Sequence, residues 1–319
     1  KKQGDALAII EDVLQKQPDY IEAISLKALI LMQNEKFDSA LMLLNPVIDS
    51  GVDDLSLHLL KIQLDAKRKN IDAVIADYER LSKLYPDKQE FKFALAKIYS
   101  QSGKKQQAET LLRQVVDSTP SDIKPKLVLL EFLNSLDKEK ALEQVQTYSA
   151  ENQGQPEVLF KVSQWLISKQ LLTEAQALLI KIDDLVADSD DLKQKQQVTL
   201  LLAKIDFHNK ELEKSKVKVD GLITHNPEYY QAKILRAKIY MAEEQFDEAE
   251  ALLSKILWTV PRSDESLILL AQIELVKGFP EKADKKFREA LKVNPVNMRA
   301  LTAVINRSLK NKEIDYASE

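Results

Sequence analysis

Prolines recur at a constant interval along this 319-residue chain, which contains only ten of them. Pro86 and Pro120 lie 34 residues apart, and so do Pro227, Pro261 and Pro295 in succession. A small residue stands twelve positions before most of these prolines, and in the best copies another stands twelve positions earlier. These small residues are Ala6, Ala96, Ala108, Ala203, Ser215, Ala237, Ala249, Ala271 and Ala283. Marks held in register over the whole chain indicate an internal repeat of 34 residues.

Between these marks the apolar residues have helical spacing. In residues 89–120 they recur at intervals of three and four in two stretches, and Gly103 lies between the stretches. Glycine readily adopts the left-handed conformation that ends a helix, and Pro120 disfavours helical geometry in the residue before it. The alanines, which have only a Cβ, allow two antiparallel helices to cross closely. The unit is therefore predicted to be a helix–turn–helix hairpin, and the fold class all-α.

This unit resembles the tetratricopeptide repeat, in which 34 residues carry a small residue in the second helix, an aliphatic or aromatic residue four positions later and Pro near the end. The matching copies are residues 21–52, 89–120, 230–261 and 264–295. The Trp typical of the family is missing from its usual position, since Trp165 and Trp258 lie elsewhere in their repeats. The resemblance implies a right-handed superhelical solenoid of antiparallel hairpins with about eight full repeats. Residues 1–18 are then a lone second helix, and residues 297–312 a lone first helix.

The middle of the chain is less regular. The register predicts the loss of one residue near Leu136–Glu139 and an insertion of about six residues at Asp188–Lys195. We expect a single solenoid over residues 1–319, with a kink or irregular junction at 134–156 and at 186–196. The acidic run "DSDD" should either lengthen the next helix or kink the stack. Because the chain begins within a repeat, we expect it to be a fragment of a longer protein.

The sequence contains few residues that could form a catalytic or metal-binding site. The absence of Cys excludes disulfides, thiolate chemistry and zinc–thiolate sites. His58, His208 and His225 fall in different repeats, and none has the spacing of a metal-binding pair. Six scattered glycines exclude a glycine-rich phosphate loop, and the acidic residues of 183–191 lack the spacing and the glycine of a calcium loop. We therefore expect no enzyme activity, no cofactor and no metal.

Charge and hydropathy limit the classes of partner. Lys and Arg number 46 against 50 Asp and Glu, for a formal net charge of −4, which disfavours binding to a nucleic-acid backbone. No apolar run approaches the length of a transmembrane helix. The compartment stays open between the cytoplasm and the periplasm or exterior, and the absence of Cys leans slightly towards an exported bacterial protein.

The resemblance implies that the first helix of each repeat lines a concave face that binds a protein or peptide. We number the repeat so that the small residue of the first helix, such as Ala96 or Ala237, is position 8. Positions 5 and 12 are then mostly apolar and position 9 mostly polar, as in a groove that holds an amphipathic segment in register. The candidate binding residues are Phe93, Lys97, Leu127, Phe160, Gln164, Leu200, Lys204, Phe207, Ile234, Lys238, Met241, Ile268 and Leu275. The alternative is that position 5 only packs against neighbouring helices, and both interpretations remain open.

The function implied by this resemblance is a non-catalytic protein–protein interaction scaffold. Two alternatives remain: an accessory factor in bacterial cell-envelope or exopolysaccharide export, as in repeat lipoproteins that the chain loosely resembles, and the targeting arm of an enzyme domain outside this sequence. A chaperone-tail clamp is not expected, because Ser25 and Leu29 stand where that clamp has Lys and Asn. The oligomeric state and the identity of the partner stay open.

Overall fold

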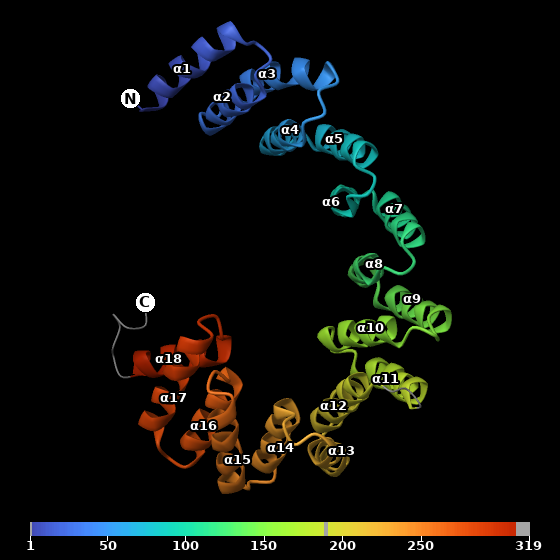
Figure 1. The fold of residues 1–319 in the computed structure, drawn as a ribbon, viewed down its shortest axis with the longest axis vertical. Helices are drawn as coiled ribbons and strands as arrows, with labels where there is room; N and C mark the ends of the chain where they lie inside the picture. The colour runs from blue at the N-terminus through green and yellow to red at the C-terminus, as the bar shows by residue number, and fades with distance from the viewer. Residues whose placement is uncertain (1, 188–190, 311–319) are drawn as a thin grey trace. The chain divides into compact units, whose positions relative to one another are not determined.

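The computed structural model describes residues 2–187 and 191–310, which form eighteen α-helices and no strand (Figure 1). The first nine helices are α1 (Lys2–Lys16), α2 (Ile21–Gln33), α3 (Phe37–Asp49), α4 (Leu55–Lys67), α5 (Ile71–Leu84), α6 (Gln89–Gln101), α7 (Lys105–Ser118), α8 (Ile123–Leu136) and α9 (Lys138–Glu151). The other nine are α10 (Pro156–Ser168), α11 (Leu172–Val186), α12 (Leu192–His208), α13 (Leu212–His225), α14 (Tyr230–Ala242), α15 (Phe246–Thr259), α16 (Asp264–Val276), α17 (Pro280–Val293) and α18 (Met298–Lys310).

These helices pair in the order that the sequence predicts. Eight hairpins run from α2–α3 to α16–α17, with α1 as a lone second helix and α18 as a lone first helix. Helices that are consecutive in sequence pack against each other along most of the chain. The all-α solenoid fold of helix hairpins is therefore confirmed.

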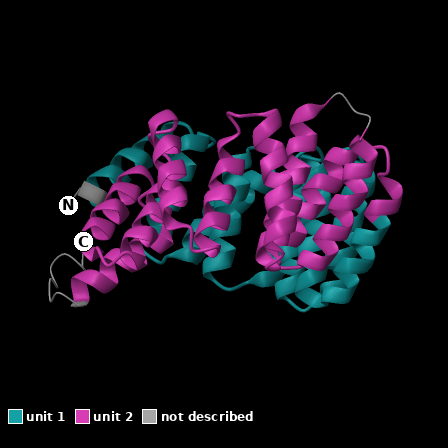
Figure 2. Cartoon of the chain, turned by 90° about the horizontal axis from the view of Figure 1, so that it is seen from below, with its two compact units in different colours: residues 1–147 teal, residues 148–319 magenta. Residues whose placement is uncertain are grey.

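The chain divides into two compact units, residues 1–147 (unit 1) and residues 148–319 (unit 2), drawn in different colours in Figure 2. The boundary falls within α9 and within the 134–156 stretch in which the sequence predicts an irregular junction. The second expected junction, at 186–196, includes residues 188–190, which lie outside the described residues. Both kinks stay predictions, and each unit is described by itself.

Seven of the eight hairpins have a three-residue turn whose middle residue has a positive φ. These middle residues are Glu35, Lys69, Gly103, Gln170, Lys210, Glu244 and Gly278. In the turn at Gly103, the Gly103 N–H donates to the Ser100 carbonyl (3.2 Å) and the Lys104 N–H donates to the Tyr99 carbonyl (2.8 Å). The other six turns have the same pair of bonds, which is the Schellman arrangement that satisfies the last carbonyls of a helix.

The turns that lead from a second helix to the next first helix are built around proline. In the turn between α7 and α8, Thr119 precedes Pro120 and has left helical geometry, with φ −138° and ψ 62°. Asn226 and Asn294, which also precede prolines, have nearly the same backbone angles. The prediction that these prolines end the second helices is confirmed.

The two predicted irregularities have clear structural forms. A single residue, Asp137, connects α8 and α9, so this hairpin lacks the three-residue turn and its positive φ. The helix α12 has 17 residues, whereas the other first helices have 13 or 14. The extra residues, 192–195, lie at its beginning and within the predicted insertion, so the insertion lengthens the helix.

The small residues lie where the two helices of a hairpin cross. Every one of them from α2 onwards is buried with at most 2% of its surface exposed: Ala28, Ala40, Ala96, Ala108, Ala141, Ala175, Ala203, Ser215, Ala237, Ala249, Ala271 and Ala283. At one crossing the Ser215 hydroxyl donates to the Ala203 carbonyl (2.8 Å), so the polar side chain is satisfied by the facing helix. Leucine, isoleucine and aromatic residues around these crossings form the apolar clusters of each unit.

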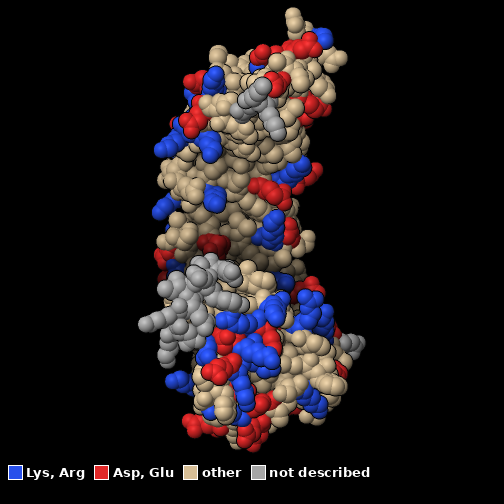
Figure 3. Space-filling view, turned by 90° about the vertical axis from the view of Figure 1, so that its left-hand side faces the viewer, with Lys and Arg blue, Asp and Glu red and all other residues tan. Residues whose placement is uncertain are grey.

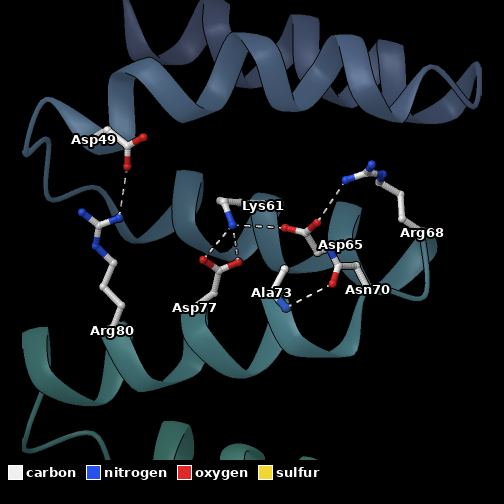
Figure 4. Close-up of polar contacts among 8 residues, drawn as sticks. All are labelled: Asp49, Lys61, Asp65, Arg68, Asn70, Ala73, Asp77 and Arg80. Atoms are coloured by element: carbon white, nitrogen blue, oxygen red, sulfur yellow. Dashed lines mark hydrogen bonds and ion pairs between the residues drawn. The ribbon is translucent and has the colours of Figure 1, made fainter.

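A buried ionic cluster connects α4 to α5 in unit 1 (Figure 4). The Lys61 ammonium contacts the Asp65 carboxylate (3.1 Å) and the Asp77 carboxylate (2.7 Å). Arg68 lies 3.5 Å from Asp65 and also reaches Asp38 of the preceding hairpin at 2.8 Å. Asp65 and Asp77 are both buried, so their charges depend on these cations for compensation.

Charged side chains also connect successive hairpins in unit 2. Lys216 of α13 lies 3.6 Å from Glu243, at the end of the next first helix. At the equivalent place one repeat later, the charges are reversed: Lys277 lies 2.6 Å from both Asp247 and Glu250 of α15. These side chains occupy related repeat positions, so each junction has its own charge pattern.

Candidate functional site

In the four hairpins of unit 2, from α10 to α17, the position-5 side chains are covered, whereas Thr302 at position 5 of α18 is exposed. Phe160, Leu200, Ile234 and Ile268 have between 3% and 8% of their surface exposed. Leu200 packs in a cluster that includes Leu222 of its own hairpin and residues of the next first helix, and Ile234 and Ile268 belong to similar clusters. These four residues therefore pack between neighbouring helices, which is the alternative to a role in ligand binding.

The position-12 side chains of the same unit are accessible. We call this set the position-12 row: Ile167, Phe207, Met241, Leu275 and Leu309. The first three are half-buried, whereas Leu275 is 49% exposed and Leu309 is 55% exposed. In unit 1 the same position holds Met32, Ala66, Ser100 and Asn134. A continuous apolar row at position 12 is therefore a property of unit 2.

A row of hydrogen-bond donors runs one helical turn away, at position 9. This position-9 row consists of Gln164, Lys204, Lys238, Gln272 and Asn306. All five side chains carry N–H donors. Lys238 is half-buried and pairs with Glu265 of α16 at 2.5 Å. In unit 2, α10, α12 and α14 lie on one side of the stack and α11, α13 and α15 on the other, so both rows belong to the first-helix side (Figure 1).

The candidate residues of unit 1 do not form such a row. Phe93 and Leu127 are half-buried, and Lys97 is exposed. The Lys124 ammonium lies 5.6 Å from the centre of the Phe93 ring and 3.3 Å from the Glu90 carboxylate. The Phe93 ring therefore already has a cationic neighbour from α8, the first helix of the next hairpin.

A pocket of about 180 Å³ lies at the beginning of the position-12 row, where α10, α11 and α12 meet. Its lining residues are Ile167, Gln170, Leu172, Leu201, Lys204, Ile205 and His208. Apolar side chains form most of its wall, and Lys204 is its only aliphatic amine. Lys204 was predictable from the repeat spacing, whereas Leu201, Ile205 and His208 were not, because the pocket depends on how α10, α11 and α12 meet.

Lys204 differs electrostatically from its neighbour Lys238. No hydrogen bond or ion pair satisfies its ammonium among the described residues, and partial burial of this group lowers the pKa of Lys204. The Glu265 carboxylate acts in the opposite direction, but its closest cation is Lys238. The Lys204 residue as a whole is exposed, and its side chain lies at the edge of the apolar pocket.

A second cavity, of about 430 Å³, lies in unit 1 against α6 and α7. Its residues are Leu95, Tyr99, Gln106, Gln107, Thr110, Leu111 and Gln114. Tyr99 donates a hydrogen bond to Glu79 (2.5 Å), and burial together with this carboxylate raises the pKa of Tyr99 to about 12. The Tyr99 hydroxyl is thus committed to an internal contact.

Other classes of site have little support in the described residues. Within residues 2–187 and 191–310, no group of three or more His, Cys, Asp or Glu could hold a metal ion. None of the described helices is long and apolar enough to cross a membrane. On the face drawn in Figure 3, Lys and Arg are interspersed with Asp and Glu.

Comparison with known proteins places the fold. Residues 1–111 match the family model of the N-terminal TPR repeats region of Psidin, where TPR denotes the tetratricopeptide repeat. A tetratricopeptide repeat protein from Parabacteroides merdae ATCC 43184 is similar in structure, with a TM-score of 0.50 and 17% identity over 77% of this chain and 96% of that one. At this identity the likeness concerns the fold alone.

Two further solved structures are similar at lower scores. The Cut9–Hcn1 hetero-tetramer of the APC/C has a TM-score of 0.45 at 14% identity, covering 92% of this chain and 57% of its own. The pilF protein of Pseudomonas aeruginosa has a TM-score of 0.42 at 17% identity, covering 66% and 94%. No curated protein sequence matches the chain.

Proposed function

Since this chain is built of tetratricopeptide repeats, we propose that it is a non-catalytic scaffold that binds a protein or peptide segment along the first-helix side of unit 2. The position-12 row supplies apolar contacts in this proposal, and the position-9 row supplies hydrogen bonds. The compartment and the identity of the partner are left open.

One observation carries the proposal: the hairpins of unit 2 bury position 5, whereas position 12 is apolar and at least partly exposed. A solenoid has no structural need for apolar residues on an accessible row, because its core lies between the helices of neighbouring repeats. Contiguous exposed apolar side chains are typical of interaction sites. Leu275 and Leu309 are the most exposed members of the row.

The position-9 row favours an extended ligand over a helical one. Each of its side chains can donate a hydrogen bond, and the backbone carbonyls of an extended segment are free to accept one. In a helical ligand those carbonyls are engaged within the helix. The proposed ligand is therefore an extended segment with apolar side chains on the position-12 row and carbonyls at the position-9 row.

The proposal is tested by two charged substitutions, Met241→Asp and Leu275→Asp. Each should abolish capture of the partner by the full chain, because a carboxylate on the apolar row would be desolvated by the ligand. Circular dichroism should remain helical, since Leu275 is exposed and Met241 lies at the margin of its core cluster and is only partly buried.

The matched control is Trp258→Asp on α15. Trp258 is 88% exposed and also apolar, but it lies on a second helix and outside both rows. This variant should capture the same partner as the unmodified chain. Equal capture by all three variants would exclude the first-helix side of unit 2 as the binding surface.

A further inference from the structure

Three large apolar side chains are almost fully exposed where the last two hairpins of unit 2 connect to the helices that follow them. Trp258, near the end of α15, is 88% exposed. Val296, in the turn between α17 and α18, is 77% exposed, and Met298, the first residue of α18, is 71% exposed. None of the three belongs to the position-12 row, so the proposed partner site does not account for them.

The structure holds these side chains on one edge of unit 2. The Asp264 carboxylate, at the beginning of α16, accepts hydrogen bonds from the Asn294 side chain (2.8 Å) and the Asn297 side chain (2.9 Å) of the next turn. Leu257, the neighbour of Trp258, packs against the apolar cluster that α16, α17 and α18 share. Residues 255–264 and 292–299 therefore form a common surface, which we call the turn edge.

The turn edge carries positive charge that no carboxylate of the described residues compensates. Its exposed cations are Lys255, Arg262, Lys292 and Arg299, and none of them has an ion-pair partner among the residues that the structure describes. The only carboxylate within these two segments, Asp264, is engaged by the two asparagines, and the adjacent Glu265 pairs with Lys238. This local excess of cations contrasts with the formal net charge of −4 for the whole chain.

The shape of the turn edge favours a soft surface over a peptide. Neither of the two cavities described above is lined by its residues, so its apolar side chains project from turns and helix ends and do not enclose a groove. Trp has an amphipathic ring that suits the boundary between lipid headgroups and acyl chains. Lys and Arg can keep their charged ends at the headgroups while their aliphatic stems lie lower.

From these observations, we propose that the turn edge is a peripheral membrane-binding surface for anionic phospholipids. Trp258, Val296 and Met298 enter the headgroup boundary in this proposal, and the four cations contact the anionic headgroups around them. The inference goes beyond the proposed function and does not depend on it. An acidic protein surface is the alternative that the test separates from it.

The first test is sedimentation of the full chain with vesicles of phosphatidylcholine that contain about 30% phosphatidylserine. Binding should be at least ten-fold tighter than to pure phosphatidylcholine, because each cation near an anionic surface contributes about five-fold in affinity. Arg262→Gln and Arg299→Gln should therefore each weaken binding about five-fold. The matched control Lys285→Gln removes an exposed cation of α17 outside the turn edge and should change nothing.

The second test asks whether the apolar side chains enter the bilayer. Trp258 is exposed and the other tryptophan, Trp165, is buried, so a blue shift of the emission on binding reports Trp258. Lipids brominated on their acyl chains should quench this emission. Trp258→Ser should weaken binding about ten-fold, as expected for loss of a large buried apolar surface. Val276→Ser, which removes a 62% exposed side chain at the end of α16, provides the control and should bind like the unmodified chain.

Equal binding to anionic and neutral vesicles, or bound protein whose tryptophan emission is not quenched by brominated lipid, would overturn the inference. Binding of poly-glutamate as tight as that of the anionic vesicles, without quenching by brominated lipid, would assign the turn edge to an acidic protein instead. The Met241→Asp and Leu275→Asp variants test the proposed function separately, because both residues lie outside the turn edge. Trp258→Asp should lose vesicle binding and keep capture of the partner, so the two proposals can fail independently.

Discussion

The middle residue of each hairpin turn adopts a conformation that most residues avoid. Among the seven such residues, Gly103 and Gly278 adopt it without a steric penalty, whereas Glu35, Lys69 and Glu244 have a Cβ close to the following carbonyl. This strain costs about 1–2 kcal/mol per residue. The two hydrogen bonds of the turn and the packing of the hairpin offset it.

We predict opposite effects for alanine at two glycines. Gly103→Ala should destabilise the chain by about 1 kcal/mol, because φ is +79° there, although no atom lies within 4 Å of the added Cβ. Gly221→Ala, inside α13 and equally uncrowded, should stabilise it by about 1 kcal/mol, since alanine favours the helix. Urea unfolding of both variants measures the change in the free energy of unfolding, which should be negative for Gly103→Ala and positive for Gly221→Ala. Destabilisation by both would contradict the conformational explanation.

The reverse substitution should relieve strain at an existing side chain. Lys69 is exposed and has φ +59°, and Lys69→Gly should stabilise the chain by about 0.5–1 kcal/mol after the entropy cost of glycine. Thermal unfolding measures the gain. Gln63→Gly, at an exposed position inside α4, provides the control and should be destabilising by about 1 kcal/mol.

His58 is buried in unit 1 beside charged groups. Burial and the nearby Arg80 lower the pKa of His58, while Asp53, Asp77 and Asp54 act in the opposite direction. A lowered pKa means that the unfolded chain binds the proton more readily than the folded chain. Stability should therefore fall as the pH drops through the ordinary histidine pKa of about 6.5.

The corresponding prediction concerns the melting temperature of unit 1 at pH 7.5 and at pH 5. The unmodified chain should melt at a lower temperature at pH 5, and His58→Gln should reduce the difference between the two values. Circular dichroism of both proteins at both pH values provides the measurement. An unchanged difference in the variant would assign the pH dependence to other groups.

Among the elements, the closest approach of two helices depends on the small residue at their crossing. Ala249 is completely buried between α14 and α15. Ala249→Leu should overpack this crossing and cost about 1–3 kcal/mol. Ala251→Leu, on an exposed position of the same helix, should cost little. Equal denaturation midpoints for the two variants in urea would refute the assigned register.

The ionic cluster between α4 and α5 should respond strongly to loss of its central cation. Lys61→Met leaves the buried Asp77 carboxylate without its ion-pair partner and Asp65 with only Arg68 at 3.5 Å, at a cost of about 3 kcal/mol or more. Lys16→Met removes the exposed pair with Asp12 and should cost less than about 1 kcal/mol. Chemical denaturation measures the free energy of unfolding of both variants. A similar loss in the two would mean that water solvates the ionic cluster.

The hairpins were predictable because each has local sequence marks. Pro120 ends a second helix, and Ala96 and Ala108 lie where α6 and α7 cross, as the spacing indicates. The turn at Lys69 carries no such mark, because its geometry results from the Schellman hydrogen bonds and not from the residue. Turn length was therefore easier to predict than turn conformation.

The candidate site was less predictable, because exposure depends on neighbouring helices. Phe160 and Ile167 are both apolar residues of α10, yet one is buried and the other lines an open pocket. Sequence spacing alone left both interpretations of position 5 open. The involvement of His208 follows from the meeting of α10, α11 and α12, for which the sequence has no local signal.

At the scale of the whole molecule, we expect a destabilising substitution to affect mainly the hairpin that carries it and its neighbours. In a solenoid each hairpin contacts only its neighbours, so damage at one place need not reach another. Lys61→Met should therefore accelerate amide hydrogen exchange in α4 and α5 and leave α14 to α17 as protected as before. Hydrogen exchange followed by mass spectrometry resolves these helices. Uniform acceleration along the chain would show that it unfolds as one cooperative block.

The charged contacts between hairpins make the order of the modules matter. Lys216 now faces Glu243, and Lys277 faces Asp247 and Glu250. Excising α14 and α15 would keep the 34-residue periodicity but bring Lys277 against Lys216, so a junction that attracts would become one that repels. Although the hairpins share one architecture, they cannot be exchanged freely, because the charges at each junction suit only the hairpins that now meet there.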